Sequence, residues 1–284
     1  MSRKLAWITG AGGLIGHQLV LDAPRCAPGW EVRGLTRQEL DLAHFDAVTR
    51  AFTGQKPQLI IHCAALSRSP ACEADPSLAG FTNVSVTHHL CGLAEGIPFF
   101  FFSTDLVFDG RKGNYVETDQ VNPLSIYAET KVKAEHCVLQ NRRHTVIRTS
   151  LNGGVSPSGR RGFNEELRHA WQEGRFLPLY TDEFRSPLPA AVTARAVWEL
   201  IGHGAAGIFH IGGGERLSRW DIGQLVAARC PQFLPRLQRG SLRDYRGAPR
   251  PPDTSLNCAK AEALLGWRLP GLGEWLRDHP HEPF

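Results

Sequence analysis

Short apolar runs alternate with amphipathic segments over the first half of the chain. A continuous apolar run predicts a buried strand, and apolar residues at helical spacing predict a helix that packs on a sheet. Because the two alternate with short connections, the pattern indicates an α/β fold with a doubly wound parallel sheet. The predicted strands are residues 5–9, 30–35, 59–63, 98–103 and 145–149, and the predicted helices are 14–22, 42–52, 76–95 and 127–140.

The pattern becomes less regular after residue 150. Residues 153–162 are rich in Gly, Ser and Arg, which is typical of a loop. Further helices are predicted at 163–173, 190–201, 218–228 and 259–265, and further strands at 176–180 and 207–211. We therefore expect a main domain of residues 1–150 plus about 189–211, and a smaller interleaved C-terminal lobe of residues 151–188 plus 212–284.

Composition and charge exclude several classes of protein. The chain of 284 residues is 42% hydrophobic and 21% charged, with a net charge of +4, so we expect no nucleic acid and no membrane as partner. Its seven cysteines show neither CxxC pairs nor zinc-ligand spacing, which favours free thiols and no metal site. The first predicted strand begins near the N-terminus and leaves no room for a signal peptide, so we expect a cytoplasmic protein.

A glycine-rich turn joins the first predicted strand to the first predicted helix. Gly10 permits the tight turn, Gly13 lets the backbone approach a phosphate, and Gly16 lets the helix pack closely on the sheet. The helix N-terminus that follows attracts anions. This arrangement is typical of a Rossmann dinucleotide-binding domain, and it predicts contacts to the cofactor from Gly10, Gly12, Gly13, Leu14 and Ile15.

The end of the second strand bears on which dinucleotide binds. Thr36 and Arg37 stand where an NAD-binding domain commonly has a carboxylate, and Arg37 could pair with a 2′-phosphate. We therefore predict NADP(H), and because Arg37 could instead be a solvated loop residue, NAD(H) stays open. Further cofactor contacts are predicted at Asp41 and Leu42, beside the adenine, and at the small residues Cys63, Ala64 and Ala65.

A phenol and an ammonium share one face of the helix predicted at 127–140. Tyr127 and Lys131 are four residues apart, so Lys131 can lie near both the Tyr oxygen and the nicotinamide ribose. A nearby cation lowers the pKa of a phenol and makes it a better acid or base near neutrality. Ser103, Thr104 and Asp105 follow a strand directly, where a hydroxyl can donate to a carbonyl oxygen. Together with the glycine-rich turn, these residues indicate hydride transfer between a nicotinamide and a carbonyl.

Motifs along nearly the whole chain resemble those of extended short-chain dehydrogenases/reductases, and within them the dTDP-4-dehydrorhamnose reductase family. They are TGAGGLIG (9–16), TRQELDL (36–42), STDLVFDG (103–110), NPLSIYAETKVKAE (122–135), RTS (148–150), DEFRSPLPA (182–190) and RPPDTSLNCAKAEALLGW (250–267).

The resemblance implies NADPH-dependent reduction of the 4-keto group of a nucleotide-linked 4-keto-6-deoxysugar. Thr104 would hold the carbonyl, Tyr127 would protonate the oxyanion, and Lys131 would bind the ribose and tune Tyr127. The C-terminal lobe would bind the substrate. Further implied positions are Asn83 near the cofactor, Asp105, Val107 and Asn152 near the sugar, and Arg185 and Arg250 near the diphosphate.

Four positions depart from related patterns. Leu151 and Asn152 stand where the family has an aromatic residue, which leaves the sugar nucleotide open, and His62 replaces a common Asn. Leu106 follows Asp105 where 4,6-dehydratases carry Glu, which argues against water elimination. Two alternatives remain: a non-catalytic NADP-binding regulatory subunit similar to the methionine adenosyltransferase beta subunit, and a reductase or epimerase of another sugar nucleotide. The sequence also leaves open whether the protein forms a homodimer.

Overall fold

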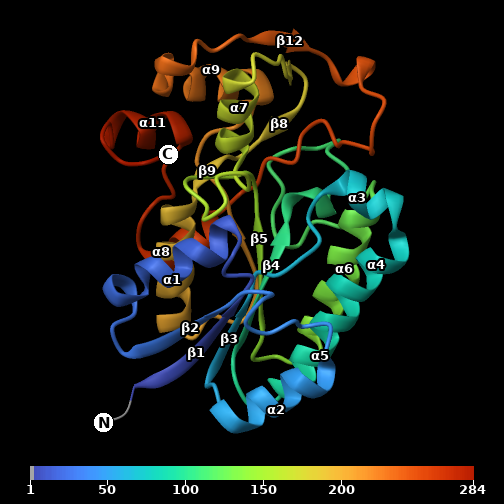
Figure 1. The fold of residues 1–284 in the computed structure, drawn as a ribbon, viewed down its shortest axis with the longest axis vertical. Helices are drawn as coiled ribbons and strands as arrows, with labels where there is room; N and C mark the ends of the chain where they lie inside the picture. The colour runs from blue at the N-terminus through green and yellow to red at the C-terminus, as the bar shows by residue number, and fades with distance from the viewer. Residues whose placement is uncertain (1–2) are drawn as a thin grey trace.

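A six-stranded parallel sheet forms the centre of the molecule (Figure 1). The computed structural model describes residues 3–284, so Met1 and Ser2, part of the stretch considered for a signal peptide, lie outside the described residues. The predicted doubly wound α/β fold is confirmed. Its strands are β1 (Lys4–Thr9), β2 (Trp30–Leu35), β3 (Leu59–His62), β4 (Phe99–Thr104), β5 (Thr145–Thr149) and β10 (Gly207–Ile211), in the order β10-β5-β4-β3-β1-β2.

Helices cover both faces of this sheet. On one face α1 (Leu14–Cys26) packs against α8 (Ala190–Gly202), with α10 (Ala259–Leu265) beside α8 and β10. The other face carries α2 (Phe45–Gln55), α5 (Val86–Leu93) and α6 (Ile126–Leu139), as Figure 1 shows.

Strand β4 explains why both faces need cover. Phe99 and Phe101 are buried in the apolar cluster beneath α5 and α6, whereas Phe100 and Phe102 are buried in the cluster on the α1 and α8 face. Successive side chains of a strand point to opposite faces, so an unbroken apolar run requires a helix layer on each side.

The helix predicted at 76–95 is interrupted. Its parts are α4 (Pro76–Gly80), a π-helical turn η1 (Phe81–Ser85) and α5, and an unpredicted helix α3 (Ser69–Ala74) precedes them. A π-helical turn accommodates one extra residue, and such turns are frequent at functional sites. Buried Asn83 lies within this turn, so the wider turn brings a polar side chain toward the neighbouring loop and α6.

The smaller lobe has its own core beside the carboxyl ends of the main strands (Figure 1). Phe163, Leu167, Leu179, Val226 and Trp275 are buried in that core. The helices are α7 (Phe163–Gln172), α9 (Arg219–Arg229) and α11 (Leu272–Asp278), and the strands are β6 (Asn152–Gly153), β7 (Pro178–Tyr180), β8 (Phe184–Arg185), β9 (Leu188–Pro189), β11 (Leu217–Ser218) and β12 (Gln238–Gly240). Single 3₁₀ turns are η2 (Asp105–Val107), η3 (Pro231–Phe233) and η4 (Leu242–Asp244).

The predicted helices of the lobe agree with α7 and α9 to within a residue or two, and strand 176–180 corresponds to the shorter β7. The two-residue strands were not predicted because two residues are too few to show an alternation of apolar and polar side chains. The exact division into 1–150 plus 189–211 and 151–188 plus 212–284 stays a prediction.

The described residues contain no helix that is long and apolar enough to cross a bilayer. Within residues 3–284, no group of three or more His, Cys, Asp or Glu is placed to hold a metal ion. The seven cysteines are free thiols.

Candidate active site

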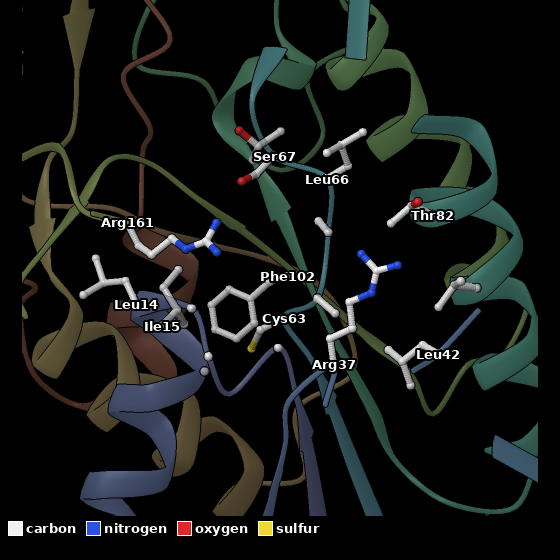
Figure 2. Close-up of a pocket in the computed structure, with 18 of the residues that line it drawn as sticks. Leu14, Ile15, Arg37, Leu42, Cys63, Leu66, Ser67, Thr82, Phe102 and Arg161 are labelled. Atoms are coloured by element: carbon white, nitrogen blue, oxygen red, sulfur yellow. The ribbon is translucent and has the colours of Figure 1, made fainter. Parts of the chain in front are cut away.

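A cavity of about 710 Å³ opens at the carboxyl ends of the central strands. Strand order reverses between β1 and β3, and ligands of doubly wound sheets bind at such a switch point. Figure 2 shows side chains from the loops after β1, β2 and β3 gathered around this opening, together with Arg161 from the smaller lobe.

The glycine-rich turn forms the cavity wall between β1 and α1. Gly10 has φ +70°, and a β-carbon there would lie 2.6 Å from the backbone nitrogen of Ala64. A β-carbon on Gly16 would collide with the Gly10 carbonyl oxygen. Helix α1 begins without a side-chain cap and without an acidic residue in its first turn, so its N-terminal N–H groups and partial positive charge are free to meet an anion.

Most predicted cofactor residues line this cavity. They are Gly10, Gly12, Gly13, Leu14, Ile15, Thr36, Arg37, Asp41, Leu42, Cys63, Ala64, Ala65, Tyr127 and Lys131. Asn83 is the exception, because it lies behind the wall. The sequence did not point to Leu66, Ser67, Phe81, Thr82, Phe102 or Phe163, which also line it, because these side chains meet only after the loops fold over the sheet.

Two buried polar side chains support the cavity from behind. The Asn83 side chain accepts from the Leu66 N–H at 2.8 Å and donates to the Leu66 carbonyl at 3.1 Å and to Thr130 Oγ1 at 2.9 Å. His62 Nδ1 lies 2.7 Å from Thr9 Oγ1. Burial lowers the pKa of His62 to about 3, so this ring is neutral and acts as a hydrogen-bonding group. Both residues hold the shape of the cavity.

Two carboxylates, Glu39 and Asp41, lie beside Thr36 and Arg37 at the predicted adenosine end of the cavity. Glu39 accepts hydrogen bonds of 2.8 Å from both the N–H and the hydroxyl of Thr36, and the Thr36 N–H bond is the main reason that the Glu39 pKa is below its usual value. Arg37 Nε lies 3.2 Å from Asp41 Oδ2, and the Arg37 side chain is 87% exposed. An exposed pair of this kind is weak, so Arg37 can turn to another anion at little cost.

Helix α6 brings Tyr127 and Lys131 to the end of β4. Ser125 caps its first turn by accepting from the Ala128 N–H at 3.3 Å. Lys131 is buried, with its Nζ 3.9 Å from the centre of the Phe101 ring. Tyr127, Lys131 and Thr104 all line the same cavity, so the three predicted catalytic side chains come together.

Burial dominates the acid–base properties of this group. It raises the pKa of the Tyr127 phenol above its usual range; the Asp105 charge acts in the same direction, and interaction with the Thr104 hydroxyl opposes them. Burial also lowers the pKa of Lys131 to about 7, against the attraction of Glu135. The expected lowering of the Tyr127 pKa by Lys131 is therefore not what the structure shows. Instead, Tyr127 is a firmly protonated phenol, which suits a proton donor.

A buried ion pair lies behind Lys131 and was not predicted. Arg148 donates to both carboxylate oxygens of Glu135, with an Arg148 Nη2 to Glu135 Oε2 distance of 2.7 Å. Ser103 Oγ donates to the same carboxylate at 2.5 Å. These contacts join the ends of β4 and β5 to α6, and so they fix the strand that carries Thr104 relative to the helix that carries Lys131.

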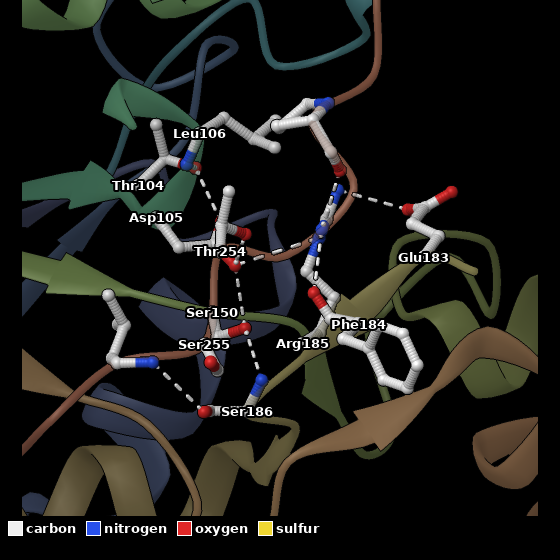
Figure 3. Close-up of polar contacts among 12 residues, drawn as sticks. Thr104, Asp105, Leu106, Ser150, Glu183, Phe184, Arg185, Ser186, Thr254 and Ser255 are labelled. Atoms are coloured by element: carbon white, nitrogen blue, oxygen red, sulfur yellow. Dashed lines mark hydrogen bonds and ion pairs between the residues drawn. The ribbon is translucent and has the colours of Figure 1, made fainter. Parts of the chain in front are cut away.

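Two of the residues that the resemblance implied for the substrate, Asp105 and Arg185, belong to a polar network behind Thr104 (Figure 3). Asp105 accepts from Ser150 Oγ at 2.8 Å and Thr254 Oγ1 at 2.9 Å, and its Oδ2 lies 3.7 Å from Arg185 Nε. Arg185 Nη2 in turn lies 3.0 Å from Glu183 Oε1. These side chains already satisfy one another, so the network serves first to shape the wall around Thr104.

The other implied substrate residues also lie away from the open cavity or are already bonded. Val107 is fully buried in the core, and Arg250 Nη1 lies 3.1 Å from Glu183 Oε2. Asn152 does line the cavity, but it donates to Thr149 Oγ1 at 2.9 Å and accepts from Thr193 Oγ1 at 2.6 Å. Direct contact of these residues with a substrate stays a prediction.

A family model described as the RmlD substrate binding domain matches residues 4–279. The chain belongs to this family. It is 30% identical to the dTDP-4-dehydrorhamnose reductase of Sinorhizobium fredii, a match that covers 95% of this chain and 94% of the relative. It is also 30% identical to the methionine adenosyltransferase 2 subunit beta of Xenopus tropicalis, over 94% of this chain and 84% of the relative. The chain is therefore similar both to a protein named as a reductase and to one named as a subunit of another enzyme.

Solved structures share the whole architecture. A dTDP-4-dehydrorhamnose reductase of Clostridium acetobutylicum superposes with a TM-score of 0.87 at 25% identity and covers 97% of this chain and 98% of that chain. The Bacillus anthracis protein of the same name, solved in complex with NADP, has a TM-score of 0.88 at 22% identity and covers 98% of each chain. At 22% identity, the match to the Bacillus anthracis protein shows that the two proteins share a fold.

Proposed function

We propose that the protein is an NADPH-dependent reductase of a carbonyl group. The observation that carries this proposal is that the glycine-rich turn, Thr104, Tyr127 and Lys131 line one cavity. Membership of a family that includes dTDP-4-dehydrorhamnose reductases supports it. The residues fit the cofactor: the uncapped start of α1 suits a pyrophosphate, and a β-carbon at Gly10 would press on the backbone of Ala64.

The proposed substrate is a nucleotide-linked 4-keto-6-deoxysugar, reduced at its 4-keto group. The named reductase relative supports this choice, and Leu106 after Asp105 agrees with a reduction that needs no elimination step. NADPH, when bound, supplies the hydride. Thr104 donates a hydrogen bond to the substrate carbonyl, Tyr127 transfers its phenolic proton to the oxygen, and Lys131 donates to the ribose and stabilises the phenolate that forms.

We propose NADP(H) over NAD(H) because Arg37 is exposed and held only by a surface ion pair, which leaves it available to a 2′-phosphate. Asp41 and Glu39 lie close by, so this preference depends on Arg37 outweighing them.

A second candidate is a non-catalytic NADP-binding subunit. The Xenopus tropicalis relative supports it, and so does the site: Asn152 is bonded to Thr149 and Thr193, and no aromatic side chain stands at 151–152. This candidate predicts tight NADPH binding without turnover.

The test follows the absorbance of reduced nicotinamide while the purified protein is mixed with NADPH and a panel of 4-keto-6-deoxysugar nucleotides. We expect consumption with at least one of them, and a loss of more than about a hundredfold in kcat for Tyr127→Phe, because general acid catalysis contributes about that much or more. Lys131→Met is compared with Lys133→Met, an exposed position of the same helix, and only the first is expected to impair turnover. Wild-type protein that binds NADPH yet reduces no member of the panel would contradict the proposal.

A further inference from the structure

The loop between β6 and α7 is fastened by the first turn of α7. Asn164 Oδ1 accepts from the Gly154 N–H at 3.1 Å, and Asn164 Nδ2 donates to the Gly154 carbonyl at 2.9 Å. These two bonds hold the start of the loop. Asn164 is itself fully buried, so the anchor belongs to the core of the lobe.

The far end of the same loop is held by one buried carboxylate. Glu165 accepts from the N–H and the hydroxyl of Ser156, both at 2.7 Å, from the Arg161 N–H at 2.7 Å and from the Gly162 N–H at 2.8 Å. Burial raises the pKa of Glu165, but these hydrogen bonds outweigh it, so the pKa lies below its usual value. The backbone at Arg161 is therefore held in one place although its side chain is exposed.

This fastened loop lies against the first residue of α1. A β-carbon added at Gly162 would lie 3.3 Å from Leu14 Cδ2, and one at Gly154 would lie 3.4 Å from Leu14 Cδ1. Leu14 is where the phosphate-binding helix begins. The lobe thus contacts the main domain at the point where the cofactor pyrophosphate is expected.

Arg161 extends from this contact into the cavity. Figure 2 shows its side chain reaching from the loop above Leu14 and Ile15, and Arg161 lines the cavity. Of the other cavity cations, Arg37 lies beside Asp41 at the predicted adenosine end and Lys131 lies beside Phe101, near Tyr127. Within residues 3–284, Arg161 makes no ion pair within 4.0 Å, so its guanidinium is the cation available to an anion at the start of α1.

We propose that Arg161 binds the pyrophosphate of the dinucleotide cofactor from the side of the substrate lobe. This inference rests on the cofactor-binding part of the proposed function. A guanidinium matches two phosphate oxygens with its paired N–H groups, and the N–H groups at the start of α1 would contact the same pyrophosphate. Part of the cofactor affinity then comes from the lobe, and Glu165 is the positioning residue that holds Arg161 there.

The experiment measures Kd by titration for Arg161→Gln and for the matched variant Arg160→Gln, whose side chain is exposed next to it and does not line the cavity. The probes are NADPH, NADH and adenosine 2′-phosphate, which lacks a pyrophosphate. We expect Arg161→Gln to raise Kd about tenfold for NADPH and NADH alike, equivalent to about 1.4 kcal/mol, and to leave adenosine 2′-phosphate unchanged. Arg161→Lys should recover part of the loss, and Arg160→Gln should stay within about twofold of wild type.

Two results would overturn the inference. One is equal affinity of Arg161→Gln and Arg160→Gln for both dinucleotides. The other is a loss with NADPH and adenosine 2′-phosphate but not with NADH, which would place Arg161 at the 2′-phosphate. Neither result depends on a sugar substrate. If the protein reduces no ketosugar nucleotide but Arg161→Gln weakens the binding of NADPH and NADH, this inference stands and the proposed reaction is wrong.

Discussion

Glu135→Gln is a direct test of how α6, the helix that carries Tyr127 and Lys131, is held. Glu135 and Arg148 have side chains that are 3% and 4% exposed, and three Arg148 N–H contacts of 2.7–3.2 Å reach the carboxylate. Arg148 Nη1 is buried without a hydrogen-bond partner in the part of the chain that the structure describes, so its charge depends on this one carboxylate. Gln preserves the shape and removes the negative charge.

The expected loss of unfolding free energy is large for one substitution. Removing one partner of a buried pair costs about 3–5 kcal/mol. Because Gln keeps one oxygen acceptor for Ser103 and Arg148, we expect about 3 kcal/mol, the lower end of that range. A chain of 284 residues has an unfolding entropy of about 0.6 kcal/mol per degree, so Tm should fall by about 5 °C.

Urea unfolding followed by circular dichroism measures this loss. The control is Arg25→Gln, which removes a surface ion pair in which Arg25 Nη2 lies 3.3 Å from Asp22 Oδ1. This control should change the free energy of unfolding by about 0.5 kcal/mol or less. The double variant Glu135→Leu/Arg148→Met should recover much of the loss, since an apolar pair needs no compensating charge. If Glu135→Gln unfolds within about 1 kcal/mol of wild type, the pair does not hold α6 and the reasoning is refuted.

Three further outcomes are expected. Arg37→Ala should raise Kd for NADPH much more than for NADH in equilibrium titrations, because only NADPH carries a 2′-phosphate; equal effects would remove the basis for NADP(H) preference. Gly10→Ala should lower stability by about 2 kcal/mol and abolish NADPH binding, since it forces a side chain into φ +70° with its β-carbon 2.6 Å from the Ala64 nitrogen; an unaltered urea midpoint would contradict this. The Lys131 pKa of about 7 means that its ammonium is present below that pH and lost above it. Kd for NADH should therefore rise from about pH 6 to about pH 8, and Lys131→Met should flatten this profile; a flat wild-type profile would count against the role of Lys131.

Local rules made much of the fold predictable. The four phenylalanines of β4 must be covered on both sides, the glycines at 10, 13 and 16 fit only a tight strand-to-helix turn, and a four-residue spacing puts Tyr127 and Lys131 on one helix face. Each of these patterns is set by neighbours in the chain.

The pKa values and the role of Asp105 could not be predicted in this way. They depend on how deeply a group is buried and on which distant charges surround it, as Arg185 and Thr254 surround Asp105. The same holds for the π-helical turn around Asn83, whose partners Leu66 and Thr130 come from other segments.

By itself, then, the sequence determined the parallel sheet, the glycine-rich turn and the placing of Tyr127 and Lys131 on one helix face, because strand alternation, glycine sterics and helical spacing act within a few residues. Only the tertiary structure decided that burial keeps Tyr127 protonated and that Glu135 and Arg148 form a buried pair. It alone placed Arg161, which two side chains of the smaller lobe hold beside the start of α1. Electrostatics and desolvation are set by groups that are remote in sequence, and folding is what brings those groups within reach of one another.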